Sequence, residues 1–145
     1  MSAAALLARR SVPHARRDVP SPRRPAVRTL LEQSRQGLLD AEYASRPMDR
    51  YAQAHLAALR AAAVVLAVRA RPRRRARSAS VWVLLPTVAP ELAEWCVFFA
   101  ATSATRAAAE AGVRRLVTTR DADDLVRQAG EFLAVVERAV SGTSR

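Results

Sequence analysis

Apolar side chains recur at three- and four-residue intervals along most of this 145-residue chain, and no segment alternates apolar and polar residues as a half-buried strand would. This periodicity predicts long helices at about residues 26–44 and 48–70, from Pro90 to Gly112, and from Thr119 or Asp121 to Gly142. A short helix is predicted at 81–85, with Ser80 as its cap and Pro86 after it. The chain is therefore predicted to be all-α, a bundle of four main helices and one short helix.

Small residues dominate the predicted core, because 32 of the residues are Ala. Residues 61–68 are apolar on every side of their helix and should be buried all round. The run from Trp95 to Phe99 also wraps the whole circumference of its helix, which is therefore either central to the bundle or part of a subunit interface. We predict association of two copies or of a small protein partner through the side chains of Trp95, Phe98 and Phe99.

The formal net charge of +11 is very unevenly distributed. Residues 1–28 hold seven Arg and one acid, residues 69–77 hold six Arg and no acid, and the remaining residues sum to −1. Four prolines and few large apolar residues in the first segment predict a disordered basic tail at 1–25. The helical bundle is predicted at 26–142, with an Arg-rich loop at 71–79.

The Arg-rich loop is a candidate nucleic-acid contact through Arg71, Arg73, Arg74, Arg75 and Arg77. About six cations would neutralise phosphates without reading sequence, and binding would weaken steeply with salt. No aromatic residue lies in the loop or the tail to stack on unpaired bases, so a solvated linker is the competing interpretation.

The remaining sequence features exclude several classes of site. One Cys and two His are too few for a disulfide framework or a zinc site, which fits a reduced, cytoplasmic setting with no metal or cofactor. The most apolar runs fall short of the roughly 20 residues that cross a bilayer, so no membrane span is predicted. Cys96 lies in an apolar run and is predicted to be a buried, inert thiol. Three acids, Asp121, Asp123 and Asp124, are predicted to complement a helix N-terminus rather than to hold Mg²⁺.

Three segments resemble the HEPN (higher eukaryotes and prokaryotes nucleotide-binding) superfamily, in particular a small single-domain branch common in actinobacteria. They are LEQSRQGLLDAEY at 31–43, YAQAHLAALRAA at 51–62 and APELAEWCVFF at 89–99. The resemblance extends over about residues 27–140. It implies an all-α bundle of four or five helices that is often dimeric, and many members are metal-independent ribonucleases of toxin–antitoxin, defence or RNA-processing systems.

The ribonuclease signature that this resemblance implies is an Arg, four to six residues, and then a His near the start of the last helix. The last helix of this chain, at 121–140, contains no His. Arg50 and His55 have the spacing but lie on the second helix, where five residues rotate a helix by about 140°, so the two side chains do not share a face. A lone His on an apolar stripe is more often a hydrogen-bonded core residue than a base.

The leading hypothesis is therefore a catalytically inactive HEPN-like binding or interaction module, associated with nucleic acid through the Arg-rich loop. The first alternative is an active ribonuclease that uses Arg50 and His55. The second is an antitoxin-like subunit that pairs with another protein through the helix that contains Trp95.

Overall fold

The computed structural model describes residues 23–70, 80–113 and 117–142, and within them the chain is all-α as predicted. The elements in chain order are α1 (Arg23–Tyr43), α2 (Pro47–Arg69), α3 (Val81–Val88), the 3₁₀ turn η3 (Pro90–Leu92), α4 (Ala93–Glu110) and α5 (Thr119–Ser141). Helix α1 begins at Arg23, so the last residues of the predicted 1–25 tail are helical, and the rest of that tail lies outside the described residues.

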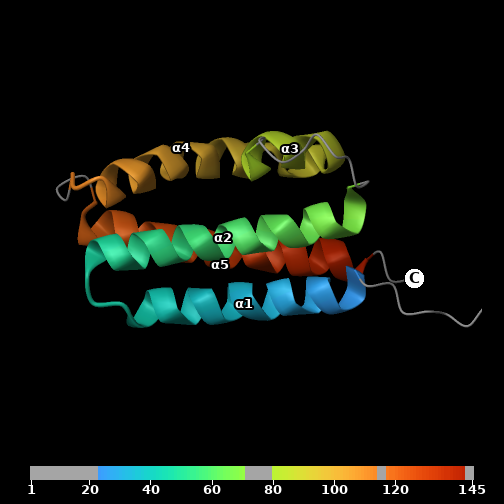
Figure 1. Ribbon diagram of the computed structural model, residues 1–145, viewed down its shortest axis with the longest axis horizontal. Helices are drawn as coiled ribbons and strands as arrows, with labels where there is room; N and C mark the ends of the chain where they lie inside the picture. Colours follow the sequence, from blue (N-terminus) through green and yellow to red (C-terminus); the bar gives the residue numbers. More distant parts are fainter. Residues whose placement is uncertain (1–22, 71–79, 114–116, 143–145) are drawn as a thin grey trace, which may run out of the picture.

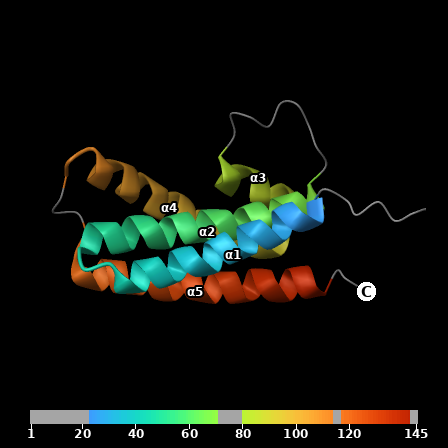
Figure 2. The same cartoon turned by 60° about the horizontal axis from the view of Figure 1, so that its bottom comes forward.

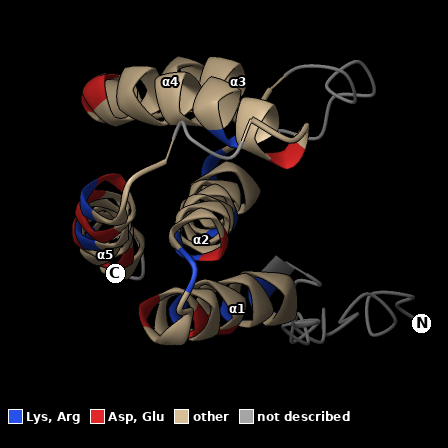
Figure 3. Ribbon diagram, turned by 90° about the vertical axis from the view of Figure 1, so that its left-hand side faces the viewer, with Lys and Arg blue, Asp and Glu red and all other residues tan. Residues whose placement is uncertain are grey.

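Helices α1, α2 and α5 form one three-helix unit, and α3 and α4 lie along a second layer above α2 and α5 (Figures 1 and 2). The most extensive helix contacts join α2 to α1 and α2 to α5, whereas α4 contacts α2 and α3 over smaller areas. The view along the bundle in Figure 3 places α2 between α1 and α4, with α5 at its side. Helix α2 is therefore the centre of the fold.

Small residues let α1 and α2 approach closely, as the Ala-rich composition predicts. A Cβ atom at the buried Gly37 of α1 would lie 3.6 Å from the Cβ of Ala57 on α2 and 3.3 Å from a guanidinium nitrogen of Arg60. One turn earlier, the buried Ser34 hydroxyl donates a 2.8 Å hydrogen bond to the carbonyl oxygen of Ala57. This crossing is fixed by a polar bond inside an otherwise apolar contact.

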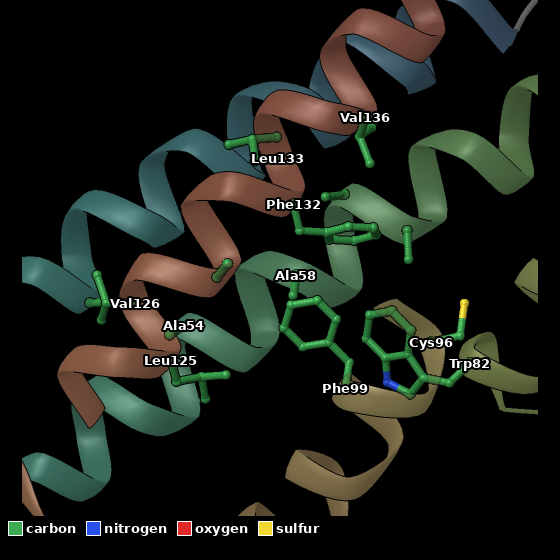
Figure 4. Packing of buried hydrophobic residues seen from close by; sticks show 14 of the residues in the cluster. Ala54, Ala58, Trp82, Cys96, Phe99, Leu125, Val126, Phe132, Leu133 and Val136 are labelled. Atoms are coloured by element: carbon green, nitrogen blue, oxygen red, sulfur yellow. The ribbon is translucent and has the colours of Figure 1, made fainter. Parts of the chain in front are cut away.

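Aromatic rings join the two layers (Figure 4). Trp82 of α3 stacks on Phe99 of α4, with ring centroids 5.0 Å apart, and both rings meet Phe132 of α5 at 6.1 and 5.1 Å. Trp95 adds contacts with Phe99 and Phe132 at 6.0 and 5.4 Å. Stacked and tilted aromatic pairs of this kind stabilise a core beyond the area that they bury.

The buried stripe of α5 agrees with its sequence pattern, since Leu125, Ala129, Phe132 and Val136 are all buried. In the run 61–68 of α2, Ala61, Ala62, Val64 and Val65 are buried, but Ala63 and residues 66–68 are only half-buried, so the predicted burial all round does not hold. By length and composition α2 could span a membrane, and half of its most apolar stretch is buried inside the protein.

One of these helix ends differs from the predicted one. Helix α3 does not stop before Pro86 but continues to Val88, because one proline removes a single helical hydrogen bond and leaves the others intact. At α4 the predicted stop holds, and Gly112 adopts a left-handed φ of 108° that other residues rarely adopt. Helix α5 begins with a capping box in which Thr118 and Asp121 bond each other's backbone N–H.

Candidate functional site

Arg50, one of the two predicted catalytic side chains, lies in the first turns of α2, where it joins three helices. Its Nη1 donates to the backbone oxygens of Glu42 at 2.6 Å and Ala44 at 3.4 Å, at the end of α1. Its Nη2 donates to Oδ1 of Asp123 on α5 at 2.6 Å. Helix α1 has no basic residue in its own last turn, so Arg50 supplies the positive charge that complements its C-terminal carbonyls.

His55, the other predicted catalytic side chain, is completely buried between α2 and the upper layer. Its Nε2 lies 3.2 Å from the carbonyl oxygen of Phe99, so Nε2 carries the hydrogen, and the ring meets Trp82 and Phe99 edge-on. Burial lowers the pKa of His55 below its ordinary value, against an opposing effect of the bond to Phe99. The imidazole is therefore neutral at pH 7, and Nδ1 is buried without a partner.

The structure does not bring Arg50 and His55 together at a reacting surface. The guanidinium is occupied by the end of α1 and by Asp123, while the imidazole has no exposed surface at all. A general acid or base must reach the proton that it transfers within hydrogen-bond distance, and substrate has no access to His55 here. The sequence interpretation of His55 as a hydrogen-bonded core residue agrees with this geometry.

The three acids at the start of α5 each have a separate structural place. Asp121 closes the capping box, Asp123 pairs with Arg50, and Asp124 lies 3.4 Å from a guanidinium nitrogen of Arg127. Within residues 23–70, 80–113 and 117–142, no three metal-ligating side chains gather at one point. The sequence did not indicate the long-range pair of Arg50 and Asp123, because nothing in it shows which of the 24 Arg pairs with which acid.

The predicted interface residues separate into different environments. Phe99 is completely buried in the core of its own chain, which contradicts its place in a subunit interface, and Trp95 is half-buried against Phe99 and Phe132. The two residues before Phe99 point elsewhere, since each residue turns a helix by 100°: Phe98 is 37% exposed and Val97 is 74% exposed.

The outer side of α4 instead carries small apolar residues that the sequence analysis did not single out. We call this surface the α4 face, and it comprises the exposed residues Val97, Ala100, Ala101, Ala104 and Ala107. Residues 95–105 contain no charged side chain, a run that could have revealed the face in the sequence. The charged residues of α4 are Glu94, Arg106 and Glu110, towards its two ends, and Figure 3 shows an acidic residue at one of those ends.

A cavity of about 340 Å³ opens between α4 and the start of α5, and we call it the α4–α5 cavity. Its lining residues are Tyr51, Phe98, Thr102, Thr105, Asp121, Asp124 and Leu125. Burial raises the pKa of Tyr51, a hydrogen bond with Thr105 opposes this change, and the negative charge of Asp121 adds to it. Phe98 lies at the edge between the cavity and the α4 face.

The predicted nucleic-acid contacts, Arg71, Arg73, Arg74, Arg75 and Arg77, lie outside the described residues, as does the whole of the 71–79 loop. The described end of that cluster is Arg69, whose guanidinium forms an ion pair with Glu91 in η3. Arg69 therefore helps to fix the end of α2 against the following elements.

Cys96 is buried as predicted, and burial raises the pKa of its thiol. A raised pKa leaves the sulfur protonated at neutral pH, which makes it a poor nucleophile.

The fold and these sites together define a small all-α bundle with a tightly packed central helix and one apolar outer face. The family model of the SAV_6107-like HEPN matches residues 41–137, two-thirds of the chain, and the chain belongs to this HEPN family. The match includes α2, α3, α4 and most of α5, and leaves out nearly all of α1. Neither the search of curated proteins nor the search of solved structures found a match to this chain.

Proposed function

We propose that this HEPN protein is a catalytically inactive interaction module that binds a protein partner through the α4 face. The proposal rests on the different environments of two sets of residues. Arg50 and His55 have structural roles inside the bundle, whereas Val97 and its Ala neighbours are left on the surface with no structural partner in the described residues. An exposed apolar face on a small soluble domain is typical of an interaction site.

Packing supports a helix as the element that covers this face. Four of its five side chains are Ala, which permit a second helix to approach closely. Val97 is the one larger side chain, and it would pack between side chains of that second helix. The partner is a second copy of this chain or a small protein that presents a helix of similar character. Exposed Val83 on neighbouring α3, 65% accessible, adds apolar surface in the same layer.

The association test compares Val97→Asp with Leu39→Asp, which places the same charge at a 47% exposed position on α1. Light scattering after size-exclusion chromatography should find the wild type and Leu39→Asp in a dimer, or in a complex with a co-purifying host protein, and Val97→Asp alone as a monomer. A wild type that is monomeric at tens of micromolar and carries no protein that Val97→Asp releases would contradict the proposal.

The absence of catalysis has its own test. Labelled RNA incubated with the wild-type protein in EDTA should remain intact, because His55 is neutral but inaccessible and Arg50 is already paired. Cleavage by the wild type that disappears in a folded His55→Gln variant would instead support the ribonuclease alternative.

Nucleic-acid association through the Arg-rich loop is a further part of this proposal. It is supported by the absence of any acid among six Arg at 69–77, although Arg69 is already paired with Glu91. Affinity for RNA and DNA should fall steeply with salt and should lose most of that slope when residues 71–77 are deleted. An unchanged slope would assign binding elsewhere.

A further inference from the structure

The α4–α5 cavity has a negative side, formed by Asp121 and Asp124. The carboxylate of Asp121 accepts a 3.1 Å hydrogen bond from the backbone N–H of Thr118, which lowers its pKa and keeps it ionised. No Arg of the described residues forms an ion pair with Asp121, although the positive charge of Arg120 also lowers its pKa.

Asp124, on the same wall, is only weakly neutralised. Its ion pair with Arg127 is 3.4 Å long, and the two side chains are 54% and 62% exposed. Exposed pairs of this kind contribute little free energy, so an incoming cation can displace Arg127 at low cost. The cavity therefore offers two carboxylates to a ligand, on a protein whose overall charge is strongly positive.

The opposite wall is aromatic and hydroxyl-bearing. Phe98, Thr102 and Thr105 lie at positions i, i+4 and i+7 of α4, so one side of that helix faces the two carboxylates. Phe98 packs edge-on against Phe99 at 5.0 Å and keeps 37% of its surface exposed. A planar cation can stack on such a ring while its N–H groups reach carboxylates, which favours a guanidinium over a compact ammonium.

We propose that the α4–α5 cavity binds the guanidinium of an arginine side chain that belongs to the protein partner on the α4 face. Phe98 connects the two surfaces, because it lines the cavity and directly follows Val97 of the α4 face. The inference rests on the proposed function, since it names the chemistry of that same partner: a helix with small apolar residues and one arginine. Asp121 and Asp124 receive the guanidinium, and the aliphatic part of the arginine lies against Leu125 and Phe98.

The test is an NMR titration of the full-length, ¹⁵N-labelled protein with the peptide acetyl-Ala-Ala-Arg-Ala-Ala-amide. The backbone amides of Thr105, Asp121 and Leu125 should shift saturably. The same peptide with citrulline, an uncharged isostere of arginine, should bind about tenfold more weakly because charge-assisted hydrogen bonds are lost. Equal binding of the citrulline peptide would overturn the proposal. Free agmatine, which has the same guanidinium and aliphatic chain as the arginine side chain, should shift the same amides, and agmatine that leaves them unchanged would also overturn the proposal.

Variants locate the binding on the protein. Asp121→Asn with Asp124→Asn should weaken the arginine peptide about tenfold, whereas Glu32→Gln with Glu42→Gln removes the same two charges from exposed positions on α1 and should change nothing. Asp124→Asn alone leaves the capping box of α5 intact and should weaken binding about threefold. Equal effects of the two double variants would show general charge screening and refute the site.

Failure of this inference and failure of the proposed function give different results. Loss of partner association in Val97→Asp without any arginine-peptide binding would keep the interaction module and remove the arginine anchor. Saturable arginine-peptide binding with no effect of Val97→Asp on association would keep the guanidinium site and remove the α4 face as the docking surface.

Discussion

The two layers of this protein are held together by different kinds of contact. The unit of α1, α2 and α5 is joined by close contacts between small residues and by polar bonds between helices, such as Ser34 to Ala57 and Arg50 to Asp123. The layer of α3 and α4 is attached mainly by aromatic rings, together with polar contacts of His55 with Phe99, Tyr51 with Thr105 and Arg69 with Glu91. Many small contacts stabilise the packing of the first region, whereas a few large side chains stabilise the attachment of the second.

This difference explains why the apolar outer face belongs to α4. A helix that is anchored along one side only has its opposite side free, and on α4 that side carries no charge between residues 95 and 105. The three-helix unit provides the scaffold, and the layer of α3 and α4 carries the proposed docking surface.

The largest effect is expected at the aromatic junction. Phe99→Ala should lower the free energy of unfolding by about 3 to 5 kcal/mol, because a completely buried ring would leave a cavity between the layers. Urea denaturation measures the change, and Val97→Ala on the exposed side of α4 is the matched control, within about 0.5 kcal/mol of wild type. Hydrogen exchange should quicken first in α4. Equal quickening in α1 would contradict the separation of the two regions.

Within the three-helix unit, the largest polar contribution is expected from Arg50. Arg50→Ala should cost about 2 kcal/mol, since it removes charge-assisted hydrogen bonds and leaves the end of α1 without its cation. Arg127→Ala, which breaks an exposed pair on α5, should cost less than about 0.5 kcal/mol. Chemical denaturation measures the free energy of unfolding of both variants. Similar losses would show that Arg50 contributes no more than a surface cation.

The close crossing of α1 and α2 is tested by side-chain volume. Gly37→Leu should destabilise the protein by about 1 to 2 kcal/mol, because the added atoms meet Ala57 at a distance that already suits a Cβ alone. Gly130→Ala on α5 is the control: its Cβ would make an ordinary 3.5 Å contact with Leu38, and it should stabilise by about 0.5 kcal/mol through helix propensity. A stable Gly37→Leu variant would mean that the crossing is loose.

The smallest effect is a pH dependence from His55. Its folded pKa lies below the ordinary value of 6.5, so above that pH neither state binds a proton and stability does not change. As the pH falls below 6.5 the unfolded imidazole takes up a proton that the buried one does not, and stability should decline by about 1 kcal/mol by pH 5.5.

Denaturation at pH 7.5 and 5.5 measures this decline. His14→Gln should keep it and His55→Gln should remove it. A flat profile for the wild type would show that His55 accepts a proton inside the fold.

The helical plan could be predicted from the sequence because periodicity and punctuation are local properties. The helix start at Pro47 and the helix ends at Gly112 and Gly142 follow from the backbone preferences of proline and glycine, which do not depend on contacts with other helices. Pro86 was misleading, since a proline weakens a short helix without ending it. For the same local reason, the capped start of α5 lay where the sequence indicated.

The candidate site was less predictable, and Phe98 and Phe99 illustrate the reason. The two residues are chemically identical neighbours, yet Phe98 lines a cavity and Phe99 lies at the centre of the core. They lie about 100° apart around the helix, and only packing against the other helices determines which side of α4 faces the core. Arg50 presented the same difficulty, as its partners lie on α1 and, 73 residues away, on α5.

By itself, then, the sequence determined the all-α class, the order of the helices, and the neutrality of a folded part that carries two strongly basic segments. Tertiary structure alone decided which Arg and His are structural, which side of α4 stays open, and that Asp121 and Asp124 face Phe98 across a cavity. Helix formation depends on residues within one or two turns. The identity of a site depends on contacts between helices, whose rotation and distance are set by the whole core.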